Sequence, residues 1–149
     1  MIIYGCDPDS SKSGIAVYKN GVLEQLESMS LITLFSIFGQ NTSIARELHI
    51  EDLNAIKSNA FAVKSKDPLP VKLRKAGNVG QCKQVQSEIE LIAKHFDIKI
   101  VRHNVSKQWK DKNGKAEFEH VTGWTGRSNE DTRSAAYFGK LGVIAHGKK

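Results

Sequence analysis

Short β-rich runs open the chain, and longer patterns of helical spacing follow them. Residues 2–6 and 14–18 are apolar and β-rich. The pair Asn20-Gly21 after the second run is a strong hairpin signal, so the residues from Val22 onward return as a third strand. The sequence therefore predicts three antiparallel strands at the start of the fold, with Asp7 at the end of the first.

The middle of the chain is less regular. Residues 31–38 are apolar and predict a helix, and residues 43–50 predict a fourth strand that ends at Glu51-Asp52. Between residues 57 and 77 the periodicity fails, Pro68 and Pro70 interrupt the chain, and lysines accumulate. We interpret this stretch as a mobile basic segment rather than a second domain.

Two helices and a short strand are predicted in the rest of the chain. Apolar residues recur at spacings of three and four over residues 79–96, which indicates a helix with one apolar stripe. Residues 98–101 predict a strand, and residues 129–144 a helix that Asn129 caps. Strands followed by alternating helices and strands indicate a single mixed-sheet α/β domain over residues 1–149.

Composition narrows the protein class. Hydrophobic residues make up 40% of the chain and charged residues 26%, which is typical of a soluble globular protein. The sequence has neither a membrane-spanning run nor the basic start of a signal peptide, so we expect a cytoplasmic protein. Cys6 and Cys82 lack metal-type spacing and are expected to be free thiols.

The net charge suggests a polyanionic partner. The chain has 22 Lys and Arg against 16 Asp and Glu, a formal charge of +6. Neutralising phosphates with such groups releases condensed counterions, which favours binding to nucleic acid. A solvated basic surface is the alternative, and charge alone does not decide between them.

Four acidic residues stand at positions that suit catalysis. Asp7 ends the first strand, Glu51 ends the fourth, and Glu130 and Asp131 open the last helix. Each by itself is better explained as a turn or capping residue. Together they suit phosphodiester hydrolysis, in which two Mg²⁺ ions about 4 Å apart activate water and stabilise the leaving oxygen. Without metal, such acids would raise one another's pKa.

Several segments resemble the RuvC-type Holliday-junction resolvases, most closely their diverged phage members. Residues 3–10 with 13–16 resemble the family's opening strand, which ends in Gly-apolar-Asp-Pro-Gly-Ser before a second strand begins at a Gly. Residues 49–51 resemble its fourth strand with the catalytic Glu, and residues 78–81 the start of its long helix. Residues 129–136 resemble the acidic, Ala-rich turn of its last helix.

The resemblance implies a ribonuclease H-like fold: a mixed five-stranded sheet, its first three strands antiparallel, flanked by helices. It also implies a homodimer that makes paired nicks in four-way junctions. Asp7, Glu51 and Asp131 are then the metal ligands for Mg²⁺, with Mn²⁺ as a substitute.

This sequence departs from the family pattern at two places. Ser134 stands where the family usually has a further Asp, so that Glu130 substitutes for it or the site uses fewer carboxylates. Asn54 stands in the region of an aromatic residue that contacts junction bases in the family. Phe61 is a candidate replacement for that aromatic residue, although ordinary packing explains it better.

Basic and aromatic residues supply candidate DNA contacts. Lys107 and Lys115 resemble basic positions near the family's active centre, where one of them, with Lys107 as the candidate, would stabilise transition-state charge. Trp109 and Trp124 are candidates for stacking on bases, although core packing is the commoner role, and His103 and His120 are expected to be structural or surface residues. The candidate phosphate contacts are Lys57, Lys64, Lys66, Lys72, Arg74, Lys75 and Lys115.

The sequence thus favours a metal-dependent endonuclease that acts on branched DNA. A ribonuclease H-type activity on RNA–DNA hybrids would use the same acids. A junction-binding protein without catalysis is the alternative from another class. The absence of the family's further acid at Ser134 is consistent with it.

Overall fold

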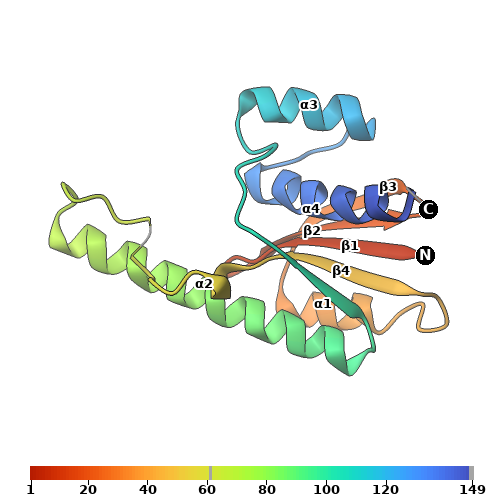
Figure 1. The fold of residues 1–149 in the computed structure, drawn as a ribbon, viewed down its shortest axis with the longest axis horizontal. Helices are drawn as coiled ribbons and strands as arrows, with labels where there is room; N and C mark the ends of the chain where they lie inside the picture. Colours follow the sequence, from red (N-terminus) through yellow and green to blue (C-terminus); the bar gives the residue numbers. More distant parts are fainter. Residues whose placement is uncertain (61, 148–149) are drawn as a thin grey trace.

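The computed structural model describes residues 1–60 and 62–147 and contains a five-stranded mixed sheet in the order β3-β2-β1-β4-β5 (Figure 1). The strands β1, β2 and β3 are antiparallel, whereas β4 pairs parallel with β1 and β5 parallel with β4. The fold class expected from the sequence is confirmed. The bounds are β1 Ile2–Asp7, β2 Ser13–Lys19, β3 Val22–Met29, β4 Arg46–Glu51 and β5 Lys99–His103.

The turn between β2 and β3 is the predicted hairpin. Asn20 and Gly21 have φ values of 50° and 84°, both in the left-handed region. A two-residue turn of this kind follows the right-handed twist of the flanking strands, which is why Asn-Gly is favoured there.

Helices cover both faces of the sheet (Figure 1). Side chains alternate along β1, so Tyr4 and Cys6 join a core with α1 and α2, whereas Ile3 joins a second core with α3 and α4. No helix of the described residues is long and apolar enough to cross a membrane. The helices are α1 Leu31–Phe38, the 3₁₀ helix η1 Leu53–Ala55, α2 Leu69–His95, α3 Lys112–Thr122 and α4 Glu130–Gly147.

Helix α2 begins ten residues earlier than the sequence pattern indicates. Pro68 is its N-cap and Pro70 lies in its first turn, where the missing N–H has no helical partner to lose. The expectation of an irregular segment over residues 57–77 is therefore wrong for residues 69–77. This part of α2 extends away from the sheet (Figure 1), so it has no apolar stripe to mark it as a helix.

Helix α3 was not expected within the basic, aromatic stretch of residues 105–126. Asp111 caps its N-terminus by accepting a hydrogen bond from Gly114 N at 2.6 Å. Trp109 is buried against Phe118 of α3, with ring centroids 5.6 Å apart, and Trp124 is half-buried against the same core. Packing rather than base stacking explains Trp109.

Helix α4 lies in backbone contact with the sheet. A Cβ at Gly5 would come within 1.9 Å of Ala135 O, and one at Gly14 within 2.2 Å of Asp131 O. Only glycine permits so close an approach. This contact places the first turn of α4 over the ends of β1 and β2. Asn129 caps the helix as expected, since its Oδ1 accepts a hydrogen bond from Thr132 N at 2.8 Å.

Candidate active site

The acids expected from the sequence lie at one edge of the sheet. Asp7 and Glu51 are the last residues of β1 and β4, whose parallel register pairs Cys6 with Ile50. Both are buried, with 4% and 3% exposure. Asp131 is half-buried in the first turn of α4, which the contact at Gly14 holds nearby.

The carboxylates act on one another electrostatically. Burial and then the charge of Asp7 raise the pKa of Glu51 from its ordinary value of 4.5 to about 8. Burial, followed by the charges of Asp7 and Asp9, also raises the pKa of Asp131. The shifts show that several negative charges are crowded into one poorly hydrated place, which favours binding of a cation.

A lysine that sequence reasoning missed lies among these acids. Lys110 Nζ is 3.0 Å from Asp7 Oδ2. Burial lowers the pKa of Lys110, but the charges of Asp7 and Glu51 outweigh burial, and the net shift is upward. Lys107, the expected basic residue, is exposed and lines a pocket of about 450 Å³ beside Glu51 and Lys110. The two lysines are three residues apart, and spacing alone does not distinguish them.

The loop that carries Lys110 is fixed from α4. The buried Arg133 donates from Nε to Trp109 O at 2.8 Å and from Nη2 to Lys110 O at 2.5 Å. Trp109 has a φ of 64°, a strained value for a residue with a bulky side chain. Because the guanidinium offers donors in a rigid fork, it holds two successive carbonyl groups and so directs Lys110 toward the acids.

The residues fit a divalent cation. Asp7 Oδ2 is buried and has no hydrogen-bond partner among the described residues, and Lys110 approaches it only as an ion-pair partner. Mg²⁺ and Mn²⁺ prefer hard oxygen ligands, which Asp7, Glu51 and Asp131 supply. No three His, Cys, Asp or Glu side chains in residues 1–60 and 62–147 form a closed ligand cluster. The acids are therefore assembled around Lys110 without closing on a common point.

The remaining candidates near the acids are less central. Glu130 is exposed and lines the same pocket as Glu51 and Lys110. Asp131 is half-buried, and its raised pKa reflects burial and the nearby charge of Asp7, which favours Asp131 as the third acid. Ser134 is buried, and its Oγ has no partner among the described residues. His103 is structural, with Nε2 lying 2.8 Å from His49 Nδ1, whereas His120 is exposed. Cys6 and Cys82 are free thiols, as expected.

The candidate DNA-binding lysines and arginine lie in two regions, one on or before α2 and one on α3. Lys57, Lys64, Lys66, Lys72 and Arg74 lie on the segment before α2 or on its protruding half, and all but the half-buried Lys72 are exposed. Two others are already paired: Lys75 Nζ lies 2.7 Å from Asp67 Oδ2, and Lys115 Nζ, on α3, lies 3.7 Å from Glu119 Oε1. Phe61, the candidate replacement for the family's base-contacting aromatic residue, lies outside the described residues.

Comparison with solved structures identifies the fold as that of RuvC. The structure of Thermus thermophilus RuvC in complex with Holliday junction substrate is similar with a TM-score of 0.59 and 11% sequence identity, covering 99% of this chain and 96% of that one. A second Thermus thermophilus RuvC structure has a TM-score of 0.59 at 10% identity and covers 99% and 97% of the two chains. No protein-family model and no curated protein sequence matches the chain. The chain therefore has a RuvC-type fold with little sequence identity to those structures.

The buried Glu51 predicts a pH-dependent stability. The unfolded chain releases the Glu51 proton near the ordinary pKa of 4.5, whereas the folded protein keeps it up to about 8. The folded state thus binds more protons across this window, and the free energy of unfolding falls as pH rises through it. In metal-free buffer, Glu51→Gln should remove the dependence.

Urea denaturation of both proteins at several pH values measures this effect. The stability of the wild type relative to Glu51→Gln should decrease by a few kcal/mol as pH rises from 4.5 to about 8. A difference that does not vary with pH contradicts the assignment of this proton to Glu51.

Proposed function

We propose that this protein is a metal-dependent endonuclease that cuts branched DNA, with four-way junctions as its substrate. The observation that carries the proposal is the burial of Asp7 and Glu51 at two neighbouring strand ends, with Asp131 near them and the Lys110 ammonium as the ion-pair partner of Asp7 Oδ2. The RuvC-type fold supports it, since one of the similar RuvC structures is a complex with Holliday junction substrate.

The three acids would hold Mg²⁺ or Mn²⁺, with two ions as the expected number. When bound, the metal supplies an activated water and stabilises charge on the leaving oxygen. Asp7 and Glu51 provide oxygen ligands from rigid strand ends, and Asp131 provides one from α4. Glu51 would hold the metal as a carboxylate, and a bound divalent charge would offset the burial and the repulsion from Asp7 that raise its pKa.

Lys110 has a separate role in this proposal. Its ammonium group is held against the acids by the contacts of Arg133 with the loop. A fixed positive charge at the edge of a buried site stabilises negative charge that develops on a phosphoryl group in the transition state. We therefore assign to Lys110 the role that the sequence suggested for Lys107.

The protruding half of α2 and the segment before it form the proposed DNA-binding arm. It projects from the end of the sheet that carries Glu51 (Figure 1), and its lysines are mostly exposed. Such an arm can follow the phosphates of a duplex whose cleaved strand lies at the acids. For its location we propose the cytoplasm, where DNA of a bacterial cell is accessible.

A second copy of the chain is the proposed partner. Ile32 and Phe35 of α1 and Leu91 of α2 are exposed, with 81%, 49% and 63% exposure. The Phe35 ring stacks on that of His95 at 5.9 Å, and Ile32 and Leu91 each lie about one helical turn before these two residues, so we take the three as one apolar patch. An isologous dimer through this patch would present two identical sites to the two opposed strands of a junction.

A junction-binding protein without catalysis is the second candidate. Ser134 supports it, since this buried residue supplies only a hydroxyl where the resembled family has a further acid. The pairing of Lys110 with Asp7 also neutralises one acid without any metal.

Cleavage assays separate these functions. The protein should nick labelled four-way junctions in Mg²⁺, and should cut linear duplex and RNA–DNA hybrid more slowly. Asp7→Asn and Glu51→Gln should each lower the cleavage rate by at least about 10³-fold and leave junction affinity intact, because the amide keeps the shape of the acid and loses a ligating charge.

One matched pair and one further variant refine this result. Asp131→Asn should resemble Asp7→Asn, whereas the exposed Glu130→Gln should retain most activity; the reverse ranking would make Glu130 the third ligand. Ser134→Ala should change little, because a hydroxyl is a poor Mg²⁺ ligand. Junction binding without nicking in Mg²⁺ or Mn²⁺ favours the second candidate, and faster cleavage of the hybrid favours a ribonuclease H-type activity.

The DNA-binding arm predicts the salt dependence of binding. Replacing Lys72, Arg74 and Lys75 by Ala should weaken junction affinity and reduce the slope of log K against log salt by about one per lost phosphate contact. Lys19→Ala is the control, because Lys19 is a paired lysine at the opposite end of the sheet. An unchanged slope in the triple variant means that the arm does not contact DNA.

The apolar patch predicts a dimer that charge disrupts. Sedimentation at micromolar concentration should show a dimer, and Ile32→Glu with Leu91→Glu should convert it to a monomer, since two buried charges in an apolar interface are strongly unfavourable. Val22→Glu is a control at a similarly exposed apolar residue on β3. A wild-type monomer that stays monomeric on junction DNA would rule out the dimer.

A further inference from the structure

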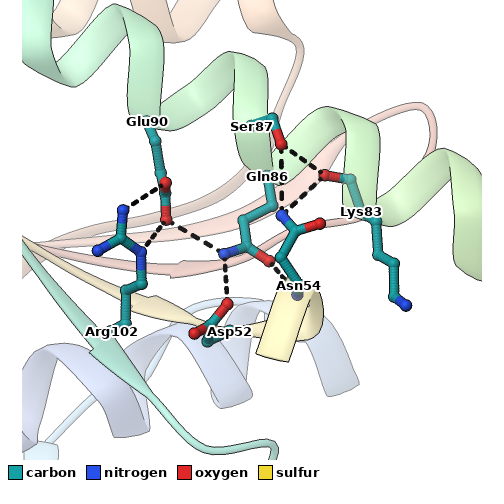
Figure 2. A network of polar contacts seen from close by, with 7 residues as sticks. All are labelled: Asp52, Asn54, Lys83, Gln86, Ser87, Glu90 and Arg102. Atoms are coloured by element: carbon teal, nitrogen blue, oxygen red, sulfur yellow. Dashed lines mark hydrogen bonds and ion pairs between the residues drawn. The ribbon is translucent and has the colours of Figure 1, made fainter. Parts of the chain in front are cut away.

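A network of polar contacts joins α2 to the segment that follows Glu51 (Figure 2). Its centre is Gln86, whose side chain is fully buried. Gln86 Nε2 donates to Asp52 Oδ1 at 2.8 Å and to Glu90 Oε1 at 3.1 Å, and Gln86 Oε1 accepts from Asn54 N at 3.1 Å. One carboxamide thus contacts the residue after Glu51, the 3₁₀ helix η1 and its own helix.

The partners of Gln86 are themselves fixed (Figure 2). Glu90 accepts two hydrogen bonds from the Arg102 guanidinium of β5, both at 2.8 Å. Asn54 Nδ2 donates to Lys83 O at 3.2 Å and to Ser87 Oγ at 3.3 Å. Arg102 therefore fixes Glu90 of α2 to β5, and the contacts of Asn54 fix η1 to α2. Gln86 joins Asp52 to this rigid set of contacts.

A glutamine is well suited to this place. It offers two donors and an acceptor, so it can serve two carboxylates and one backbone N–H at once. A glutamate there would face Asp52 and Glu90 with like charge, and an apolar side chain would leave buried polar atoms unpaired, at about 1–3 kcal/mol each. An entirely apolar contact would stabilise the fold as well. The polar contact instead gives the strand end one defined position.

We propose that Gln86 is a positioning residue that fixes the Glu51 carboxylate for catalysis by holding Asp52 and η1 against α2. The proposal rests on the endonuclease function proposed above. Glu51 is covalently joined to Asp52, whose own N–H donates to His103 O of β5 at 2.8 Å. The backbone after Glu51 is therefore held by β5 on one side and by Gln86 on the other.

The same contact links the DNA-binding arm to the acids. The helical part of the arm and Gln86 belong to one continuous helix, Leu69–His95. A rigid helix carries a displacement along its length, so a shift of α2 on DNA moves Asp52 through Gln86. The position of Glu51 should then depend on how the arm is seated on its substrate.

Gln86→Met tests the proposal, since methionine has a similar length and no hydrogen-bonding amide. The single-turnover cleavage rate of a junction should fall by about 10²-fold, the effect of a catalytic group misplaced by about 1 Å, while the junction Kd stays within about threefold. Mn²⁺ affinity, measured by calorimetry without DNA, should weaken by about tenfold. Gln84→Met is the control, because Gln84 is exposed on the same helix and its Nε2 donates to Glu88 Oε1 at 2.9 Å.

A charge-swap pair tests the contact itself. Gln86→Glu should lower the rate and the Mn²⁺ affinity, because a carboxylate cannot donate to Asp52. Adding Asp52→Asn supplies a donor from the other side and should recover part of both. A loss of packing alone would not be rescued in this way, and circular dichroism establishes that each variant is folded.

The outcomes separate the two proposals. If the wild type cleaves junctions and Gln86→Met matches Gln84→Met in rate and Mn²⁺ affinity, the positioning role is wrong. If Gln86→Met and Gln86→Glu lose DNA affinity to the same extent as cleavage rate, Gln86 acts in binding, and the positioning role is again wrong. If the wild type cleaves no DNA, the endonuclease proposal fails, and the Mn²⁺ affinities and the charge-swap rescue still decide whether Gln86 positions Glu51.

Discussion

The backbone contact between α4 and the sheet is the constraint on which the site depends. Gly5 and Gly14 let the helix approach so closely that a single added methyl group would collide with the carbonyl oxygens of Ala135 and Asp131. The contact fixes where α4 begins, and thereby brings Asp131 to the strand end that carries Asp7. It also brings Arg133 to the loop that carries Lys110. A larger residue at either glycine would displace two functional groups together.

The site itself is unfavourable for stability without a bound cation. Asp7 and Glu51 are buried side by side, and burial, followed by repulsion from Asp7, raises the pKa of Glu51 to about 8. Lys110 offsets part of this repulsion, and the contacts of Arg133 hold it in place at the cost of a strained Trp109. The rigid strand ends and the buried guanidinium of Arg133 therefore hold opposite charges close together at one place in the fold. Acids with raised pKa values that lie together in this way are frequent at functional sites.

Much of the fold, but only part of the site, follows from the sequence. The hairpin at Asn20-Gly21 and the strand ends at Asp7 and Glu51 were predictable, because local turn chemistry and β-rich runs determine them. The early start of α2 was not, since an exposed helix carries no apolar stripe. Lys110 and Gln86 were missed for a different reason. Their roles depend on contacts with Asp7 and Asp52, which lie 103 and 34 residues away in the chain, and no local pattern encodes such contacts.

Anomalous diffraction from crystals grown with Mn²⁺ locates a bound cation without relying on activity. If the three acids form a metal site, a peak should lie within coordinating distance of carboxylate oxygens of both Asp7 and Glu51, with Asp131 as a further ligand. Lys110 Nζ should then move from its position 3.0 Å from Asp7 Oδ2. A fully occupied Mn²⁺ site elsewhere, with the Lys110–Asp7 pair unchanged, would show that these acids do not form the metal site.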